Sequence, residues 1–289
     1  MQLNSGLVGS RIIGVKTEVT WRRTTSYAAA IGDTNPRYLD DTVEGGLSAH
    51  PAFAVALTWP IMEKIQEQFP EELPFEIVMT MVHAYEHLIF HRPIKPGDVI
   101  SIDGQVAAVL PTSVGTLLVL QLDATERNGG PVFTEYTGAM FRGISCNDEG
   151  RGVENLPQTP DWPDPAVPIW ESEIPISRQA SYVYDGCTDI VFPIHTSVSF
   201  AKAVGLPGII LQGTATLAMA CTQLVDREAG SDPGRLKELG CRFSRTVIPG
   251  SSIKVQLLNR DDDIGTKLGF HVLNAESEQA IKSGFARIE

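Results

Sequence analysis

The sequence lacks the features that mark several common classes of protein. Its 289 residues include only four cysteines, none of them in a Cys-x-x-Cys pair. No apolar run approaches the roughly 20 residues that a membrane-spanning helix needs, so we expect no membrane insertion. A phosphate-binding glycine loop, a Gly-x-Ser-x-Gly elbow and a zinc-binding spacing are all missing. We therefore expect neither a metal nor a cofactor.

Targeting signals and an excess of basic residues are also missing. Residues 1–14 show no charged segment followed by a long apolar run, and residues 286–289 do not spell a Ser-Lys-Leu signal. We expect the thiol of Cys221, which lies in an apolar helical run, to be packed and reduced. These observations predict a cytoplasmic protein. The net charge of −12 would repel a phosphate backbone, so we expect no nucleic-acid partner.

Two segments recur in the same order about half the chain apart. Two residue pairs have a spacing of 157, Pro36 with Pro193 and Tyr38 with His195. The run Arg92-Pro-Ile-Lys-Pro-Gly matches Arg245-Thr-Val-Ile-Pro-Gly at a spacing of 153. Matching segments at a nearly constant spacing indicate a tandem duplication. We assign the repeats to residues 1–143 and 179–289.

The two repeats are separated by residues 144–178, which are rich in proline. This segment contains Pro157, Pro160, Pro163, Pro165, Pro168 and Pro175. Proline fixes φ and supplies no amide donor. The composition predicts an extended, irregular linker.

Each repeat shows the same order of predicted elements, which together define an α+β fold. A short helix comes first, then a longer apolar helix, then three β segments. The longer helices are predicted over 52–68, where Pro60 should introduce a kink, and over 213–227. The β segments are predicted over 98–110, 115–126 and 131–142, and over 252–259, 266–274 and 279–288. We expect an antiparallel sheet to wrap a central helix in each repeat. The two sheets should join edge to edge, which removes two exposed edges, with the two helices side by side.

The second repeat carries three motifs that resemble a known family. They are Asp189-Ile-Val-Phe-Pro-Ile-His195, then Phe200-Ala-Lys-Ala-Val-Gly-Leu, then Ile210-Leu-Gln-Gly213. These resemble the motifs Gly-Asp-x-Asn-Pro-Leu-His, Phe-Ala-x-x-x-Gly-Phe and Ile-Leu-His-Gly of the MaoC-like dehydratases and hydratase-2 domains. The resemblance covers most of the chain. It implies a double hot-dog fold and a substrate that is an acyl thioester of CoA or acyl carrier protein.

Three residues depart from the motifs of that family. Asp189 lies one residue further from the histidine than usual, Phe192 replaces an asparagine, and Gln212 replaces the histidine before the glycine. If the Asp189 side chain points away from His195, then Asp185 or a backbone carbonyl must face the imidazole instead.

The resemblance implies a role for each candidate residue. Hydration of a double bond conjugated to a thioester needs a base for the water and an acid for the α-carbon. Asp189 and His195 would share one water, and the backbone N–H of Gly213 would bind the thioester oxygen. The residues expected to contact the substrate are Arg242, Arg245, His83, Gln212 and Phe192. Arg242 and Arg245 would hold phosphates of the carrier.

Several of these residues also have a purely structural interpretation. Gly213 would also be needed if the start of its helix packs closely, and the two arginines would be ordinary solvated side chains beside a strand. In the first repeat Tyr38 replaces the histidine, which indicates a degenerate site. Successive residues among His83, His87 and His91 are four positions apart, which is about 13 Å if the segment is extended, so one metal cannot bridge them.

The sequence leaves three functions open. The first is a hydratase or dehydratase acting at the 2,3 position of an acyl thioester, for which the substitutions at Phe192 and Gln212 suggest a role in secondary metabolism. The second is a non-catalytic acyl-binding or scaffold protein, suggested by Phe192 and Gln212. The third is a thioesterase or isomerase on the same fold. We also expect a homodimer, because such proteins often pair.

Overall fold

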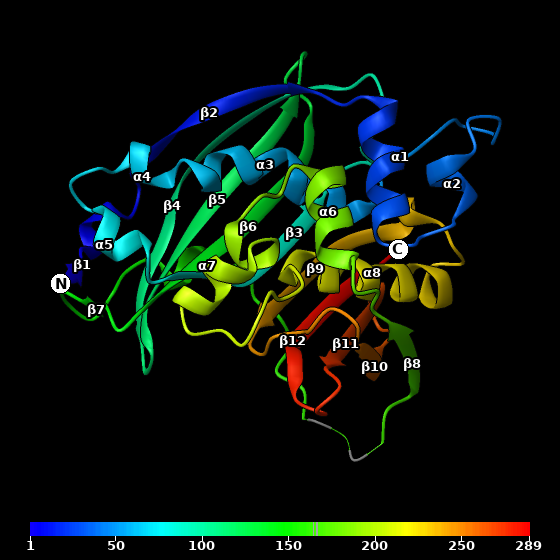
Figure 1. The fold of residues 1–289 in the computed structure, drawn as a ribbon. Helices are drawn as coiled ribbons and strands as arrows, with labels where there is room; N and C mark the ends of the chain where they lie inside the picture. Colours follow the sequence, from blue (N-terminus) through cyan, green and yellow to red (C-terminus); the bar gives the residue numbers. More distant parts are fainter. Residues whose placement is uncertain (164, 166) are drawn as a thin grey trace.

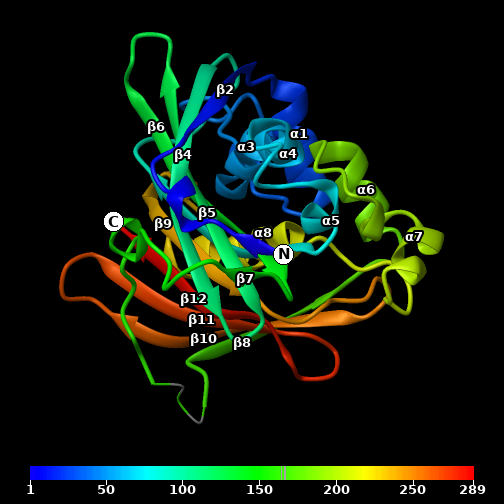
Figure 2. The same ribbon diagram turned by 90° about the vertical axis from the view of Figure 1, so that its left-hand side faces the viewer.

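A single curved antiparallel sheet forms the frame of the protein. The computed structural model describes residues 1–163, 165 and 167–289. Ten strands follow the order β2-β4-β5-β6-β3-β9-β12-β11-β10-β8. The helices gather on one side of this sheet (Figures 1 and 2). A separate small sheet pairs β1 with β7 in parallel.

The first repeat supplies five strands of the long sheet and most of the short helices. Its elements are β1 (Gln2–Leu3), the 3₁₀ turn η1 (Ser5–Leu7), β2 (Arg11–Glu18), α1 (Trp21–Ala30), α2 (Pro36–Leu39), the turn η2 (Pro51–Phe53), α3 (Ala54–Glu63), α4 (Ile65–Gln68), α5 (Phe75–Val78), β3 (Met81–Phe90), β4 (Val99–Thr112), β5 (Gly115–Glu126) and β6 (Pro131–Arg142). The three β segments predicted in this repeat match β4, β5 and β6.

The second repeat supplies four of the other five strands and the longest helix, and the segment before it supplies β8 (Trp170–Pro175). The elements of the second repeat are α6 (Ala180–Thr188), the turn η4 (Pro193–His195), α7 (Val198–Ala203), α8 (Gly213–Glu228), the turn η5 (Pro233–Arg235), β9 (Leu236–Phe243), β10 (Ser252–Asp261), β11 (Thr266–Leu273) and β12 (Gln279–Ile288). The three predicted β segments match β10, β11 and β12. Most of α8 is buried, as its small and apolar composition predicts.

The two halves of the sheet join through the antiparallel pair β3–β9. His87 pairs with Gly240 at the centre of this ladder. Adding 153 to the residue number on β3 in the pair before it gives the residue on β9 in the pair after it, so the ladder maps onto itself when the two strands are exchanged. A pseudo-two-fold axis therefore passes through the His87–Gly240 pair. A Cβ atom on Gly240 would lie 2.4 Å from Nδ1 of His87, so only glycine fits there. The prediction of one continuous sheet is confirmed.

The helix predicted over 52–68 forms as three elements, η2, α3 and α4, and its break does not fall at Pro60. Pro60 lies inside α3, which continues to Glu63 and is capped by Lys64. Proline deprives the carbonyl four residues earlier of its helical donor. Nη2 of Arg23 lies 3.5 Å from that carbonyl, at Ala56, and supplies a replacement donor.

Contacts between the helical layers of the two repeats run mainly between α1 and α6 and between α8 and η2.

The proline-rich segment is more ordered than its composition predicted. It contains β7 (Ser145–Cys146), the turn η3 (Val153–Asn155) and β8, which pairs with β10. β8 thus extends the second half of the sheet as β2 extends the first through its pairing with β4. In the chain between η3 and β8, Trp162 packs against Gly269 and Phe285. Sheet pairing and aromatic packing fix a segment that proline alone would leave irregular.

Candidate active site

A cavity of about 490 Å³ opens between the two repeats. This volume lies within the range of pockets that bind small molecules. The second repeat contributes the loop before α8, the start of α8 and the end of β9, and the first repeat contributes α3, β3 and β6. Five of the residues predicted to act in catalysis or binding, along with Gly213, line it: His195, Gln212, Phe192, His83 and Arg245. Asp189 and Arg242 do not appear in the lining drawn from the described residues.

His195 is held in a single orientation at the wall of the cavity. It ends the turn η4, which Pro193 begins. Nδ1 of His195 lies 2.8 Å from the carbonyl oxygen of Ile210. A carbonyl only accepts hydrogen bonds, so Nδ1 carries the proton and Nε2 is left as the basic nitrogen. Burial lowers the pKa of His195 to about 4, which keeps the ring neutral at pH 7.

Gly213 is the first residue of α8 and lies where a helix offers free N–H groups. The helix dipole favours negative charge at this end. A Cβ atom on Gly213 would lie 3.0 Å from Cδ1 of Phe243, so close packing also favours glycine here. The packing interpretation of Gly213 thus has a structural basis, and its catalytic role stays a prediction.

Gln212 is a buried polar residue between His195 and the helix. Its Nε2 donates to the carbonyl of Ser181 at 3.1 Å. Its Oε1 is buried and has no hydrogen-bond partner among the residues that the structure describes. Gln212 therefore presents an unpaired acceptor in the wall of the cavity.

The structure does not bring Asp189 to His195. Asp189 caps the end of α6 with a left-handed backbone, φ 59°, and its side chain is exposed. Its N–H bonds back to the carbonyl of Asp185, which fixes that turn. The next residue, Ile190, is buried and lines the cavity instead. The carbonyl of Ile210, and no carboxylate, occupies Nδ1 of His195.

The internal duplication explains why Asp189 is displaced. Tyr27 and Tyr184 are equivalent residues 157 apart whose hydroxyls are hydrogen-bonded. Tyr38 and His195 are a second equivalent pair with the same spacing. By the same spacing, the residue of the second repeat that is equivalent to Asp33 is Ile190, and not Asp189. By the same count, Phe192 replaces Asn35. The second repeat has thus lost both polar residues of the motif.

The first repeat keeps that motif, and its polar residues are buried. Oδ2 of Asp33 accepts from Thr222 at 2.7 Å and lies 3.8 Å from Nε2 of the fully buried His50. Burial lowers the pKa of His50 to about 3. Asn35 caps α2 and also donates to Ser231. These residues form a closed polar core. That the site of this repeat is degenerate stays a prediction.

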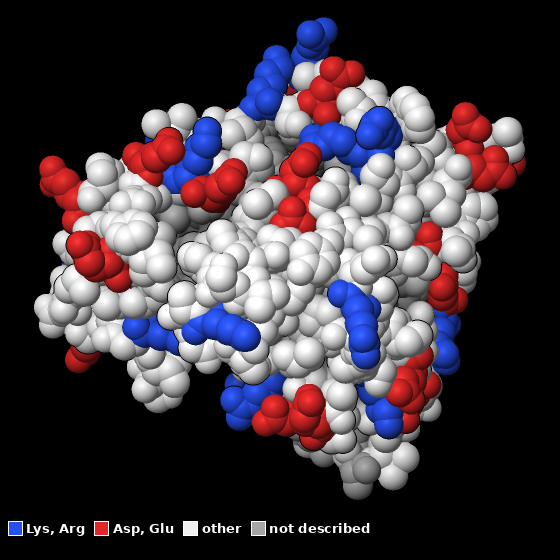
Figure 3. Space-filling model, viewed as in Figure 1, with Lys and Arg blue, Asp and Glu red and all other residues white. Residues whose placement is uncertain are grey.

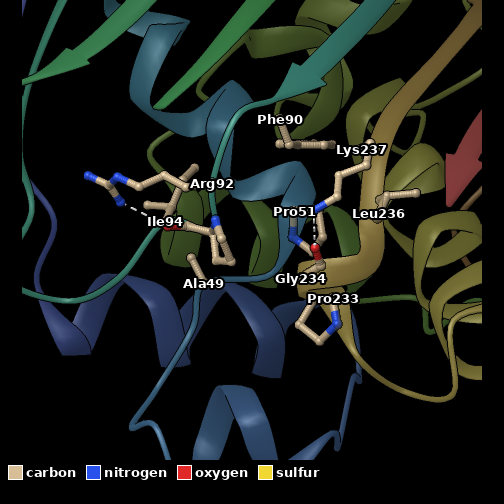
Figure 4. A pocket seen from close by; sticks show the side chains of 10 residues that line it. Ala49, Pro51, Phe90, Arg92, Ile94, Pro233, Gly234, Leu236 and Lys237 are labelled. Atoms are coloured by element: carbon tan, nitrogen blue, oxygen red, sulfur yellow. Dashed lines mark hydrogen bonds between the residues drawn. The ribbon is translucent and has the colours of Figure 1, made fainter. Parts of the chain in front are cut away.

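The counterpart of the cavity in the first repeat is nearly filled. Only about 20 Å³ remains there, between η2, the end of β3 and the start of β9 (Figure 4). Nη1 of Arg92 donates to the neighbouring carbonyl of Pro93, and Nζ of Lys237 to that of Gly234. This space accommodates no acyl group.

The two arginines proposed to bind the carrier lie on different surfaces. Arg245 lines the cavity, is 61% exposed and lies 3.4 Å from Glu278. Arg242 lies over the ring of Tyr85, 6.0 Å from its centroid. Strand alternation points Phe243 into the cavity and Arg242 away from it. Figure 3 shows basic and acidic side chains interspersed on one face, with acidic side chains beside α6 and an uncharged area around α7.

The two histidines of β3, His83 and His87, and His91 just after the strand each have a different partner. His83 bonds to Thr137, His87 to Glu238 and His91 to Thr134. Within the described part of the chain, no three His, Cys, Asp or Glu residues are grouped closely enough to hold a metal ion. Across the same residues, no helix has the length and apolar character to cross a bilayer.

Sequence reasoning missed the polar end of the cavity. Thr58, Trp59, Glu135 and Arg142 also line it. The available signal was a pair of glutamates, Glu86 and Glu135, in otherwise apolar strands.

The fold and the cavity define the class of double hot-dog proteins. A protein of Mycobacterium tuberculosis described as having a double hotdog fold superposes with a TM-score of 0.60 at 14% identity, covering 95% of this chain and 93% of its own. A MaoC-like dehydratase from Phytophthora capsici superposes with a TM-score of 0.83 at 24% identity, covering 98% and 97% of the two chains. Identity this low establishes the fold alone.

Sequence comparison identifies the family. Residues 6–135 match the FAS1-like dehydratase domain region, and residues 166–279 match the MaoC-like domain. A probable enoyl-CoA hydratase 2 from Dictyostelium discoideum is 23% identical over 98% of this chain and 95% of its own. The chain is 21% identical to the peroxisomal multifunctional enzyme type 2 of Mus musculus over 92% of its length, but spans only 36% of that protein. These matches confirm the resemblance to the MaoC-like dehydratases and hydratase-2 domains that the sequence motifs indicated.

Proposed function

We propose that the protein is a hydro-lyase that adds or removes water at the 2,3 position of an acyl thioester, with His195 as the proton-transfer group. The observation that carries this assignment is the orientation of His195. Its Nδ1 is bound to the carbonyl of Ile210 at 2.8 Å, and the free Nε2 belongs to a residue lining the cavity near the start of α8. The enzymes to which the chain is similar are named hydratases and dehydratases.

One imidazole is sufficient for the proposed reaction. In dehydration, Nε2 of His195 takes the proton from C2, and the backbone N–H of Gly213 stabilises the enolate oxygen. The imidazolium then donates that proton to the hydroxyl on C3. The C3–O bond breaks, water leaves, and the C2=C3 double bond forms. Hydration follows the same steps in reverse.

The carrier is CoA or acyl carrier protein. Arg245 is suited to a carrier phosphate because it lines the cavity and remains largely exposed. Arg242 is a weaker candidate, since its side chain lies over Tyr85. No metal or separate cofactor takes part in the steps that we propose.

A second candidate function is acyl binding without turnover. Ile190 and Phe192 line the cavity where the family motif supplies aspartate and asparagine. Such a cavity retains its apolar walls and its entrance while losing a group that positions water.

Incubation with short enoyl and 3-hydroxyacyl thioesters separates these functions. A change of ±18 Da in the acyl product, lost in His195→Gln, supports the hydro-lyase. Release of free thiol without that change supports a thioesterase. Tight binding of every thioester with neither change supports the binding protein.

We further propose a cytoplasmic homodimer. The exposed apolar side chains of α6 and α7, including Tyr182, Val183 and Val198, provide an area on which a second copy can pack. Sedimentation equilibrium tests the dimer, since a monomer at micromolar concentration contradicts it. Fluorescent tagging in the source cells distinguishes the cytoplasm from the peroxisome.

A further inference from the structure

The inner part of the cavity contains a polar cluster that the proposed reaction does not use. It is formed by Thr58 and Trp59 of α3, His83 and Glu86 of β3, and Glu135 and Thr137 of β6. Nε2 of His83 lies 3.1 Å from Oγ1 of Thr137 and 3.1 Å from Oε2 of Glu86. All of these residues except Glu86 line the cavity.

Three groups in this cluster, Glu86, Glu135 and Trp59, are buried with their hydrogen-bonding capacity unfilled among the described residues. Glu135 is 1% exposed, and its Oε2 has no partner among the described residues. Nε1 of Trp59 likewise lacks an acceptor in the part of the chain that is described. Unpaired buried polar groups are rare in proteins because each loses its hydration without compensation.

The fold itself does not require a polar cluster at these positions. The β3–β9 ladder relates residues 153 apart, so the counterparts of His83 and Glu86 are Leu236 and Leu239. Both leucines are buried, at 2% and 0% exposure. The same structural positions are thus filled by leucine in one repeat and by ionisable residues in the other. A role in binding explains this asymmetry, whereas packing does not.

The cluster is uncharged at neutral pH. Burial, and then the neighbouring Glu86, raise the pKa of Glu135 well above its usual value. Burial raises the pKa of Glu86 to about 8 and lowers that of His83 to about 4. Protonated carboxyls and a neutral imidazole both donate and accept hydrogen bonds. They suit a neutral oxygen-containing group better than an ion.

We propose that the acyl group of the substrate carries an uncharged hydrogen-bonding group, a hydroxyl or a carbonyl oxygen, that binds Glu135 and Trp59 at the inner end of the cavity. This inference rests on the proposed function for the identity of the thioester end. A plain hydrocarbon chain would leave Glu135 and Trp59 unpaired. A site built to bind a hydroxyl rejects the analogue that lacks it.

The test compares enoyl thioesters of equal length that differ only along the acyl chain. One has a plain alkyl chain, one series carries a hydroxyl moved one carbon at a time, and one ends in an ammonium group. We expect the best hydroxyl isomer to exceed the alkyl compound by about 5- to 150-fold in kcat/KM, the range for one buried polar group left unpaired. Equal or better use of the alkyl compound, or preference for the ammonium compound, overturns the proposal.

Variants assign the preference to the cluster. Glu135→Leu should reduce the hydroxyl-to-alkyl ratio toward one, and Glu135→Gln should preserve it because the amide still donates and accepts. Asp123→Asn, a carboxylate on β5 outside the cavity lining, is the matched control and should leave the ratio unchanged. A ratio that survives Glu135→Leu in a folded protein overturns the proposal, and Thr137→Val provides a second variant if Glu135→Leu does not fold.

Binding of saturated thioesters keeps this inference separate from the proposed function. If no thioester is turned over, the hydro-lyase assignment fails. Tighter binding of a hydroxylated saturated thioester than of its alkyl analogue, measured by calorimetry, then still supports the polar acyl site. Equal binding of the two overturns it.

Discussion

The hydroxyl oxygens of Tyr27 and Tyr184, equivalent residues of the two repeats, lie 3.1 Å apart in the buried interface between α1 and α6. The Tyr27 hydroxyl donates to the carbonyl of Ala52 at 2.9 Å, and that of Tyr184 donates to Oγ1 of Thr214 at 3.1 Å. Ala52 lies in η2 and Thr214 lies in the first turn of α8. This contact joins the helical layers near the pseudo-two-fold axis.

Removal of either hydroxyl should destabilise the interface modestly. Tyr27→Phe removes one donor to the carbonyl of Ala52, which keeps the N–H of Ala54, so we expect a loss of about 0.5–1.5 kcal/mol in the free energy of unfolding. Tyr184→Phe leaves Thr214 free to rotate its hydroxyl, so we expect a loss of similar size, about 0.5–1.5 kcal/mol. Urea titration of the single and double variants measures both costs. Strictly additive costs would mean that the two hydroxyls do not interact.

His195 and Asp189 should differ sharply in their effect on turnover. His195→Gln removes the only base that we assign, and a loss of about 10²–10⁴ in kcat is expected. Asp189→Asn should change kcat by less than about threefold, because an exposed side chain outside the cavity lining makes no contact with substrate. Steady-state kinetics on the same enoyl thioester measures both. If Asp189→Asn lowers kcat as much as His195→Gln does, the mechanism with two acid–base residues that the sequence predicted is restored.

Ile190→Asp should place a carboxylate where the first repeat has Asp33. A negative charge beside His195 favours the imidazolium, so the pKa of His195 should rise from about 4. A second acid–base group should also raise kcat, by up to about 10²-fold. The pH profile of kcat for the wild type and the variant tests both effects. An unchanged acidic limb would show that residue 190 does not face the imidazole.

The closed cluster of the first repeat should contribute to stability and not to catalysis. Asp33→Asn weakens its contacts with Thr222 and His50, so we expect a loss of about 1–3 kcal/mol in the free energy of unfolding. The value of kcat per folded molecule should stay within about twofold. A large loss of kcat without loss of stability would mean that the first repeat holds a second active site.

Stability should reach its maximum near pH 6.5. Burial lowers the pKa of His195 and His83 to about 4 and that of His50 to about 3. The unfolded chain then binds more protons below pH 6.5, so these residues reduce stability as the pH falls from 6.5 toward 4. Burial instead raises the pKa of Glu86 to about 8. Between about pH 4.5 and pH 8 the folded protein keeps this proton while the unfolded chain loses it, so the free energy of unfolding falls as the pH rises through this range.

Thermal melting from pH 4 to 8.5 measures this balance. Above pH 6.5 only the carboxyl effect remains, so the melting temperature should decline toward pH 8. Glu86→Gln should reduce that decline. A wild-type melting temperature that keeps rising through pH 8 contradicts the assignment of a raised pKa to Glu86.

The sequence by itself determined the duplication, the order of elements and the position of the cavity's main lining. Repeated turns at spacings of 157 and 153, apolar helix composition and strand alternation are local signals, and local signals survive without knowledge of tertiary contacts. The same information located His195, Gly213 and Arg245 at the cavity.

The tertiary structure decided which polar residues meet there. A one-residue difference in spacing was enough to move Asp189 to the exposed end of α6 and to bring Ile190 to the wall, because the left-handed turn at residue 189 changes the direction of the chain. The polar cluster around Glu135 was equally hidden from sequence. Its members come from one helix and two strands that the chain brings together only when the sheet closes over α3, and side-chain contacts at such separations leave no periodic signal.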